Sequence, residues 1–241
     1  NRDRLCMAVD MHIDEQGHVS SYRIFEGLMR SHGKLSYDGV ARALGLTKDG
    51  PHQPAAEKRV ASLEVLLDLS KRLRQRRLKR GALDFDLPEG KVVLDDRGEP
   101  EAIVQSRKDP GIRQAYRIVE DMMLVTNETV AAHIKRHAAP GVFRVHGKPD
   151  SERISMFCQV AKSFGYELDE ESAATPKQLS RFLRRIDGTN EAPLLRYLLL
   201  RAMQQAIYDT DPSEGHFALA AKDYLHFTSP IRRYPDLLVH R

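Results

Sequence analysis

The chain has 241 residues, of which 41% are hydrophobic and 30% are charged. These proportions are typical of a folded globular protein with a buried core, and no stretch approaches the roughly 18 consecutive apolar residues of a membrane span. A soluble globular protein is therefore the default expectation for these residues. Its net charge of +4 permits a polyanionic partner without demanding one.

Both ends of the chain have the features of internal positions. Residues 1–4 lack a starting Met and the apolar stretch of a signal peptide, and residues 239–241 stop within an expected helix. We therefore expect a piece of a larger protein, cut at both ends. Cys6 and Cys158 lie far apart among apolar residues, which predicts two buried thiols in a reducing cytoplasm rather than a disulfide or a metal pair.

A hairpin and a short helix are expected first. Apolar residues alternate over residues 5–26, and the sequence Asp14-Glu15-Gln16-Gly17 interrupts them, which predicts two strands joined by a turn. Residues 35–45 predict a helix that ends at Gly45, followed by a loop over residues 47–54.

A long helix is expected over residues 55–80, because its apolar residues recur at helical spacing and Gly81 can cap its C-terminus. Residues 71–80 contain seven basic side chains, which suit the negative end of the helix dipole. We interpret this basic run as a solvated helix face, with a direct nucleic-acid contact as the alternative.

Residues 83–105 predict a small antiparallel unit. Leu83, Phe85 and Leu87 alternate, and a turn at residues 95–98 separates two further apolar stretches. The alternation places Asp84 and Asp86 on the outer face of a strand, which argues against a metal site there.

The second half of the chain is expected to be mainly helical. A long helix over residues 111–138 is bounded by Pro110 and Pro140, a short strand follows at residues 143–145, and more helices are expected. Those helices cover residues 150–165, 176–187 and 191–207. The order of strands and helices along the chain lacks a regular βαβ repeat. We therefore expect one α+β domain, with a mixed, mainly antiparallel sheet packed with several long helices.

Residues 226–236 carry most of the chemical information. Ser229 and Pro230 suit the N-cap and first position of a helix, where free amides and the helix dipole attract anions. Arg232 and Arg233 follow in the first turn, where a bound phosphate or carboxylate would offset their conflict with the dipole. Pro235 would break a regular helix, so the turn with the arginines can be separate from a helix that begins near Pro235.

An alternative remains open for the two arginines. They can pair with acidic neighbours such as Asp223 or Asp236 instead of binding a ligand.

Residues 226–237 (HFTSPIRRYPDL), with His240 and Arg241, closely resemble the signature of the ribonuclease II/ribonuclease R family of 3′-to-5′ exoribonucleases. The resemblance extends in the same order over the whole chain and is closer to the ribonuclease R branch. Its other blocks are residues 3–11, 34–37, 116–127 and 143–149. It implies that residues 1–241 are the central and C-terminal portion of a single exoribonuclease catalytic domain, truncated at both ends.

The resemblance implies processive hydrolysis of single-stranded RNA to nucleoside 5′-monophosphates, with Mg²⁺ ions held by a cluster of aspartates. The chain contains no such cluster, and in the family the cluster lies upstream of the block that opens this chain. We therefore expect the Mg²⁺ ligands outside the chain and no activity from the chain alone. A catalytically inactive relative that only binds RNA is the main alternative, and a protein that contacts its partner through the basic run is another.

The resemblance also implies roles for individual residues. Arg232 would face the scissile phosphate, and Tyr37 would stack on a base near the 3′ end, unless it is a half-buried core residue. Glu120 or its neighbour Asp121 would hold a sugar hydroxyl, unless they are helix-surface carboxylates. Thr228, Ser229 and Arg233 would line the phosphate path.

Three histidines near the motif, His216, His226 and His240, do not have the spacing of metal ligands, and we expect each to form hydrogen bonds within the fold. For the whole protein we expect a cytoplasmic monomer, single-stranded RNA as its partner, and flanking OB-fold domains that bind RNA.

Overall fold

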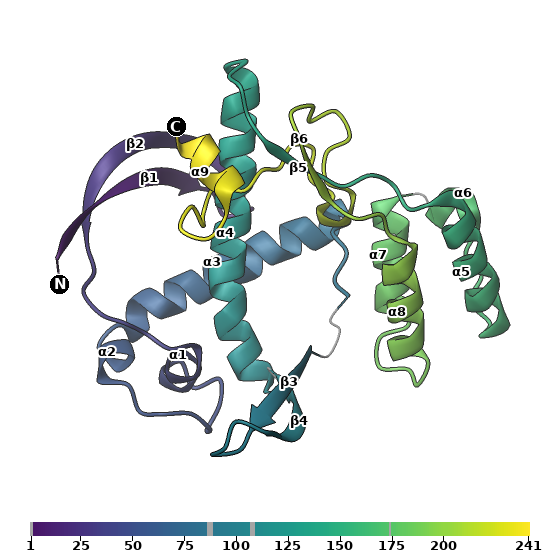
Figure 1. The fold of residues 1–241 in the computed structure, drawn as a ribbon, viewed down its shortest axis with the longest axis horizontal. Helices are drawn as coiled ribbons and strands as arrows, with labels where there is room; N and C mark the ends of the chain where they lie inside the picture. The colour runs from purple at the N-terminus through teal and green to yellow at the C-terminus, as the bar shows by residue number, and fades with distance from the viewer. Residues whose placement is uncertain (1, 86–88, 107–108, 174) are drawn as a thin grey trace. The chain divides into compact units, whose positions relative to one another are not determined.

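A computed structural model describes residues 2–85, 89–106, 109–173 and 175–241 (Figure 1). It divides into two compact units, which are described separately. The first unit comprises residues Asn1–Leu73 and Pro88–Met122, and the second comprises Arg74–Leu87 and Met123–Arg241. The α+β class is confirmed. The named strands of the described residues pair only antiparallel, in three two-stranded sheets.

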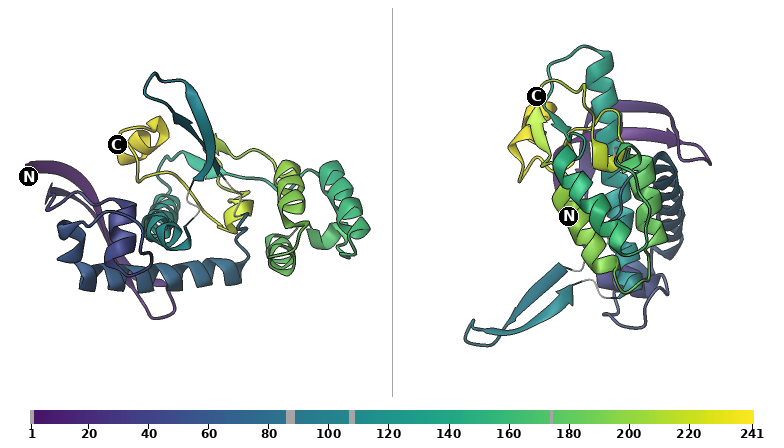
Figure 2. Two further views of the ribbon diagram at one scale, coloured as in Figure 1. Left: turned by 90° about the horizontal axis from the view of Figure 1, so that it is seen from below. Right: turned by 90° about the vertical axis from the view of Figure 1, so that its right-hand side faces the viewer.

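The first unit begins with the expected hairpin of β1 (Asp3–Ile13) and β2 (Val19–Arg30), whose strands curve side by side (Figures 1 and 2). Asp14 closes the turn, because its Oδ1 accepts hydrogen bonds from the amides of Gln16 and His18. A second hairpin joins β3 (Glu89–Leu94) to β4 (Pro100–Ser106), and its turn contains the expected Gly98 at a φ of 83°.

Helix α1 (Tyr37–Ala43) also lies in the first unit and matches the prediction. Ser36 caps it by accepting the amide of Gly39, and Gly45 follows it at a φ of 66°. The predicted helix over residues 55–80 is instead two helices, α2 (Pro54–Glu57) and α3 (Val60–Arg80).

Helices α3 and α4 (Pro110–Arg136) are the longest elements, and the division between the units falls within both. Asp109 begins α4 by accepting the amide of Ile112. Side chains from α1, α2, α3 and α4 form the core of the first unit, with Ala41, Ala56, Leu63 and Ala115 buried.

The second unit contains the remaining described helices. These are α5 (Ser151–Ser163), α6 (Glu170–Ala173), α7 (Pro176–Arg185), α8 (Ala192–Ala202), the short 3-10 helix η1 (Phe217–Leu219) and α9 (Tyr234–His240). The sequence did not predict α6. The helix expected over residues 191–207 ends at Ala202, because residues Ile207–Asp209 form strand β6, which pairs with β5 (Phe143–Val145).

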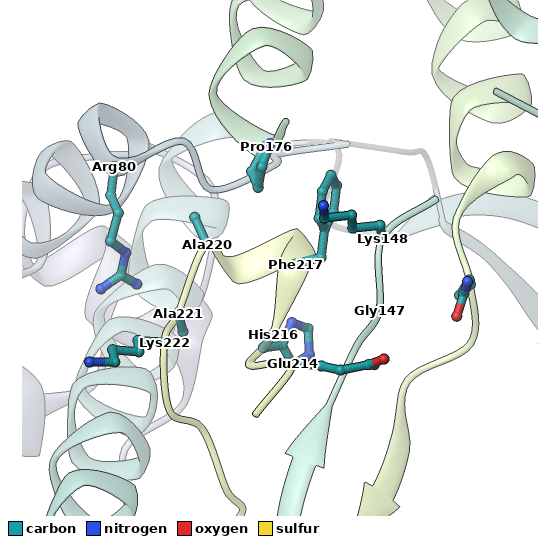
Figure 3. A pocket seen from close by; sticks show the side chains of 11 residues that line it. Arg80, Gly147, Lys148, Pro176, Glu214, His216, Phe217, Ala220, Ala221 and Lys222 are labelled. Carbon is teal, nitrogen blue, oxygen red and sulfur yellow. The ribbon is translucent and has the colours of Figure 1, made fainter. Parts of the chain in front are cut away.

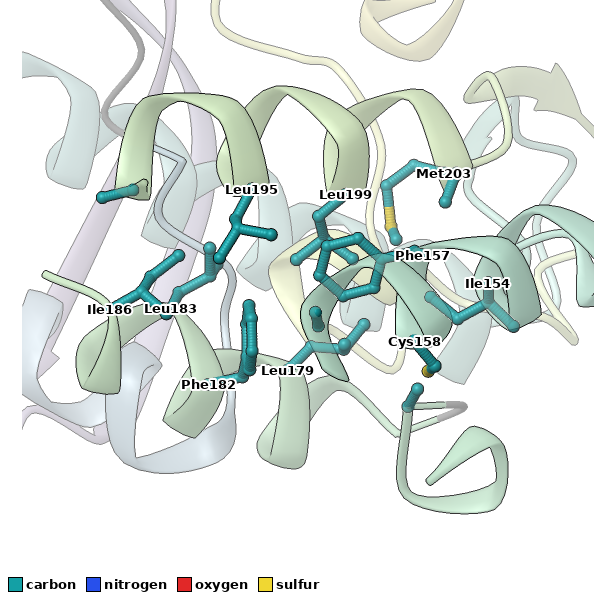
Figure 4. Packing of buried hydrophobic residues seen from close by; sticks show 14 of the residues in the cluster. Ile154, Phe157, Cys158, Leu179, Phe182, Leu183, Ile186, Leu195, Leu199 and Met203 are labelled. Atoms are coloured by element: carbon teal, nitrogen blue, oxygen red, sulfur yellow. The ribbon is translucent and has the colours of Figure 1, made fainter. Parts of the chain in front are cut away.

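Helices α5, α7 and α8 bury a shared apolar core (Figure 4). Leu195 and Leu199 of α8 and Leu179 of α7 are fully buried, and the rings of Phe157 and Phe182 meet edge to face. Phe217, from the segment that follows β6, belongs to the same core.

The strand expected at residues 83–87 is absent from its described part. Leu83 and Phe85 pack against the helical core instead, and Asp84 pairs with Arg74. Asp86 and Leu87 lie outside the described residues. Both cysteines are free thiols. Cys158 is buried as expected, whereas Cys6 on β1 is half-exposed, so the prediction of two buried thiols is wrong for Cys6. None of the described helices is long and apolar enough to cross a membrane.

Candidate functional site

The segment Thr228–Arg233 forms a turn that precedes a helix. The amides of Arg232 and Arg233 both donate to the carbonyl of Ser229, and α9 begins only at Tyr234, with Pro235 in its first turn. Ser229 and Pro230 therefore do not begin a helix. The sequence also allowed a turn with the arginines that is separate from a helix beginning near Pro235, and this arrangement is the one observed. Proline favours the first turn of a helix and disfavours its interior.

Asp236 fixes this turn from within α9. Its side chain is fully buried, and its Oδ1 accepts hydrogen bonds from the Ser229 amide at 2.8 Å and from Arg233 Nη2 at 2.8 Å. The pairing foreseen for the arginines is therefore present for Arg233, whereas Asp223 pairs with Lys135. The amides of Ser229, Arg232 and Arg233 are all engaged within the protein, so they do not form the open anion site that a helix start would have given.

Arg232 differs from its neighbour. Its side chain is exposed, and its guanidinium forms no hydrogen bond or ion pair with any residue that the structure describes. Thr228 and Ser229 are half-buried, and the hydroxyl oxygen of Thr228 has no hydrogen-bond partner. The turn therefore exposes one free guanidinium, that of Arg232, while Asp236 holds its backbone in place.

Both backbone groups of Phe227, just before the turn, are held by side chains. The Phe227 amide donates to Asn127 Oδ1 at 3.0 Å, and the Asn127 amide group donates to the Tyr224 hydroxyl at 3.1 Å. His240 Nε2 donates to the Phe227 carbonyl at 2.8 Å, and its ring stacks on the Phe227 ring. We assigned no role to Asn127 from the sequence. The one indication of its role in the sequence is that a polar residue lies on the buried face of the helix predicted over residues 111–138.

The expectation that the nearby histidines form hydrogen bonds within the fold is confirmed. His216 Nδ1 accepts the Leu219 amide, and His226 Nδ1 lies 2.8 Å from the Tyr208 hydroxyl. Burial, reinforced by neighbouring cationic groups, lowers the pKa of His216 to about 3 and that of His226 to about 4. Both rings are therefore neutral near pH 7. Within the described residues, no group of three or more His, Cys, Asp or Glu side chains is placed to hold a metal ion.

In the first unit, Tyr37 opens α1 and stacks on Tyr116 of α4, with ring centroids 3.6 Å apart and an interplanar angle of 18°. Tyr37 is 36% exposed and Tyr116 is half-buried. The tyrosine is therefore neither a core residue nor an isolated surface ring. It forms the accessible member of an aromatic pair.

The sequence did not decide which of two neighbouring carboxylates on α4 can bind a ligand, and the structure distinguishes them by their exposure. Glu120 is exposed, whereas Asp121 is 1% exposed and accepts a hydrogen bond of 2.6 Å from the Ser70 hydroxyl on α3. Only Glu120 can reach a ligand without a rearrangement of the unit. Tyr37, Glu120 and Asp121 lie in the first unit, and the structure groups Thr228, Ser229, Arg232 and Arg233 in the second.

Comparison with known protein families gives a match over the entire chain. The model of the RNB domain matches residues 1–241. The chain belongs to the RNB domain family. Ribonuclease R of Aquifex aeolicus is 39% identical over 100% of the chain and 33% of its own length, and ribonuclease R of Escherichia coli is 36% identical over 99% of the chain and 28% of its own length. The chain thus spans about a third of the length of these relatives.

Solved structures of the family share this fold. The apo form of RNase R from Mycoplasma genitalium superimposes with a TM-score of 0.87 and 26% identity, over 100% of the chain and 36% of that protein. Yeast Ssd1, described as a pseudonuclease, superimposes with a TM-score of 0.73 and 21% identity, over 100% of the chain and 28% of that protein, a likeness that concerns the fold alone.

Proposed function

We propose that the protein containing this chain degrades single-stranded RNA processively from its 3′ end by hydrolysis, releasing nucleoside 5′-monophosphates, and that the chain forms part of the RNA path. Membership of the RNB domain family and the ribonuclease R relatives support a ribonuclease. The M. genitalium RNase R has also been solved in complex with ribose-methylated single-stranded RNA and with double-stranded RNA.

The observation that carries the proposal is the difference between Arg232 and Arg233. Arg233 is held by a buried carboxylate, which immobilises the turn, whereas Arg232 extends into solvent with its guanidinium free. A guanidinium fork matches two oxygens of a phosphodiester, and a preorganised donor stabilises charge that develops on the phosphate in the transition state. Ser229 would contact the same backbone through its hydroxyl group. The hydroxyl oxygen of Thr228 is buried and the Arg233 guanidinium pairs with Asp236, so these two residues would hold the turn that presents Arg232.

The residues of the first unit would bind the bases and sugars. Tyr37 would stack on a base, a contact worth roughly 1–3 kcal/mol for any base, and Tyr116 would support it from its other side. Glu120 would accept a sugar hydroxyl. We propose a structural role for Asp121, because it is buried against Ser70.

The residues in the described part of the chain do not suit a Mg²⁺ site, since no cluster of carboxylates is found there. We place the Mg²⁺ ligands in the polypeptide before residue 1, and we expect the 241-residue chain alone to be inactive. The whole protein would act as a cytoplasmic monomer with flanking OB-fold domains.

An inactive protein that binds RNA without cleaving it is the second candidate. The likeness of the fold to a yeast pseudonuclease shows that this architecture is not restricted to active nucleases. Degradation of RNA by the full-length protein would support the nuclease, and binding without degradation would support the inactive protein.

The test uses the full-length protein and a 5′-labelled single-stranded RNA with Mg²⁺. Arg232→Ala should lower kcat by about 100- to 1,000-fold, as expected for a lost transition-state donor, and Arg232→Lys should restore part of the rate. Arg181→Ala, which removes an exposed arginine of α7, is the matched control and should leave kcat unchanged. An unchanged kcat in Arg232→Ala would contradict the assigned role, and an inactive parent protein that still binds RNA would favour the second candidate.

A further inference from the structure

Two of the pockets within the second unit differ in the groups that they offer to a ligand. The larger one, of about 600 Å³, lies beside η1 (Figure 3), where Glu128 and the Leu219 carbonyl engage the Arg80 guanidinium and Phe217 is buried in the core. The smaller one, of about 430 Å³, is a groove between α5 and α8 with exposed apolar and cationic side chains on its walls. We define the α5–α8 groove by its lining residues Arg153, Met156, Phe157, Val160, Leu198, Arg201 and Ala202.

On α5, the core and the groove use different faces of the helix. Arg153, Met156 and Val160 are spaced i, i+3 and i+7, so they lie on one face, whereas Ile154 and Cys158 are buried in the core on another. Val160 is half-buried, but Met156 is 65% exposed. The core therefore leaves apolar surface of α5 uncovered.

On α8, a second stripe has the same helical spacing. It consists of Leu194, Tyr197, Leu198 and Arg201. Tyr197 is 50% exposed and Leu194 is also exposed, whereas Leu195 and Leu199 point into the core from the opposite face (Figure 4). The amide of Asp150, the N-cap of α5, donates to the Ala202 carbonyl, which places the start of α5 beside the end of α8. The two stripes therefore adjoin.

Two arginines lie at one end of the groove. Arg153 Nη1 donates to the Arg201 carbonyl at 3.4 Å, and the Arg201 guanidinium lies 5.9 Å from the centre of the Tyr197 ring. Both arginine side chains are exposed, and neither forms an ion pair with a residue that the structure describes. None of the lining residues is acidic. The groove therefore combines an apolar surface with positive charge that its own walls do not neutralise.

This composition is typical of a surface that binds protein. Interfaces are enriched in Met, Tyr and Arg and depleted in Lys, Asp and Glu, and a Met side chain adapts its shape to a partner. The stripe from Leu194 to Arg201 extends over roughly 10 Å, or about two helical turns. An amphipathic helix docks in such a groove through apolar residues at i, i+3 or i+4, and i+7.

We propose that the α5–α8 groove binds an acidic, amphipathic helical segment of another protein. Its apolar residues would contact Met156 and Leu198, and its carboxylates would pair with Arg153 and Arg201. The proposal is independent of the role of Arg232 and of any nuclease activity.

The charges of the groove argue against two other occupants. A second copy of the chain, docked through the same surface, would bring the same arginines and no carboxylate from the lining residues. A nucleic-acid strand is bound mainly through cations and hydrogen-bond donors to its phosphates, and the aliphatic side chains of Met156, Val160 and Leu198 offer neither. An acidic amphipathic segment satisfies both the apolar surface and the arginines.

Selection of random peptides displayed on phage, against the immobilised full-length protein, tests the proposal. Peptides about 15 residues long can form about four helical turns. Counter-selection against the Met156→Glu variant removes peptides that bind elsewhere. The enriched peptides should have apolar residues at helical spacing and an excess of Asp and Glu. Fluorescence anisotropy of a labelled synthetic copy of the most enriched peptide then gives its affinity.

Two variants and two matched controls locate the binding. Met156→Glu puts a charge on the apolar wall and Arg201→Glu reverses a charge at the end of the groove, so each should weaken peptide binding by about tenfold or more. Gln159→Glu adds the same charge at an exposed position of α5 outside the groove, and Arg181→Glu reverses an exposed charge on α7. Neither control should change the affinity. A peptide with Lys in place of its acidic residues should bind Arg201→Glu more tightly than it binds the parent protein.

The outcomes also test the other occupants. Failure to enrich any peptide, a basic consensus, or equal affinities of the parent protein and Met156→Glu overturns the proposal. Sedimentation that shows a dimer dissociated by Met156→Glu would assign the groove to a second copy. Competition between the peptide and single-stranded RNA, or RNA binding weakened by Met156→Glu, would assign it to RNA. Arg232→Ala should leave peptide binding unchanged, so failure of the nuclease assignment would be seen separately.

Discussion

Two basic regions of the molecule use their charges differently. The run at residues 71–80 contains seven basic side chains, but Arg72 pairs with Asp68, Arg74 with Asp84, and Arg80 with Glu128. The turn at residues 228–233 contains only two arginines, one of which is held by Asp236 while the other is free.

The comparison shows that density of charge does not locate a binding site. Three of the seven basic side chains of the run pair with carboxylates of the chain, which favours its interpretation as a helix face over a nucleic-acid contact. In the turn, one carboxylate holds one arginine and thereby fixes the backbone that presents the other. Pairing therefore determines which cation remains available to a ligand.

The largest effect is expected from Asp236→Ala. Removing this carboxylate leaves the Arg233 guanidinium and the Ser229 amide without their acceptor in a buried position, so the free energy of unfolding should fall by about 3–5 kcal/mol. Urea denaturation measures the loss. Asp187→Ala, which breaks the pair of an exposed aspartate with Arg196, is the control and should cost less than about 1 kcal/mol. Equal losses in the two variants would show that Asp236 does not hold the turn.

Acid should destabilise the second unit through its half-buried histidines His216 and His226. The pKa of His216 is lowered to about 3 and that of His226 to about 4 in the folded state, against about 6.5 when unfolded. Between about pH 6.5 and these folded-state values, the unfolded chain binds protons that the folded chain does not. The free energy of unfolding is therefore fully retained above about pH 6.5 and decreases as the pH falls toward 4 and 3.

His216→Gln should reduce the slope of unfolding free energy against pH between about 6.5 and 4, by up to one proton. Urea denaturation over a pH series gives this slope. If the variant and the parent protein have the same slope, burial of His216 is not the cause of the acid sensitivity.

A smaller effect on stability is expected from Arg80, which forms two hydrogen bonds with Glu128. Arg80 and Glu128 form two hydrogen bonds in a partly buried position, and a double-mutant cycle with alanine at both positions should give a coupling energy of about 1–2 kcal/mol. A coupling near zero would mean that solvent screens this pair as it does a surface pair. The claim that the run is neutralised internally would then be weakened.

Local signals allowed much of the fold to be predicted from the sequence. Asp14 and Gly17 close the first hairpin, and Gly45 and Gly81 follow the helices that they were expected to end, because short-range hydrogen bonds and positive φ angles determine these positions. The helix expected over residues 191–207 ends at Ala202, and Ile207 begins strand β6 instead, because the partner strand β5 lies more than 60 residues earlier in the sequence.

The residues of the candidate site were identified by the motif, but their arrangement was not. The burial of Asp121 depends on Ser70, which is 51 positions away, and Phe227 is held by Asn127, which is 100 positions away. No local pattern encodes such contacts. The sequence could therefore name both members of the pairs Glu120–Asp121 and Arg232–Arg233, but it could not tell which member is accessible.

The smallest effect is expected from Arg72→Ala, and it bears directly on the comparison of the two basic regions. Arg72 and Asp68 form an exposed pair one helical turn apart, so its loss should change the free energy of unfolding by no more than about 0.5 kcal/mol. Binding of single-stranded RNA by the full-length protein, measured over a series of salt concentrations, should retain its salt dependence in Arg72→Ala. Arg232→Ala should reduce the slope of log affinity against log salt by about one phosphate contact. If Arg72→Ala reduces the slope and Arg232→Ala does not, the basic run binds the RNA backbone and the turn does not, because only a cation that contacts phosphate releases counterions on binding.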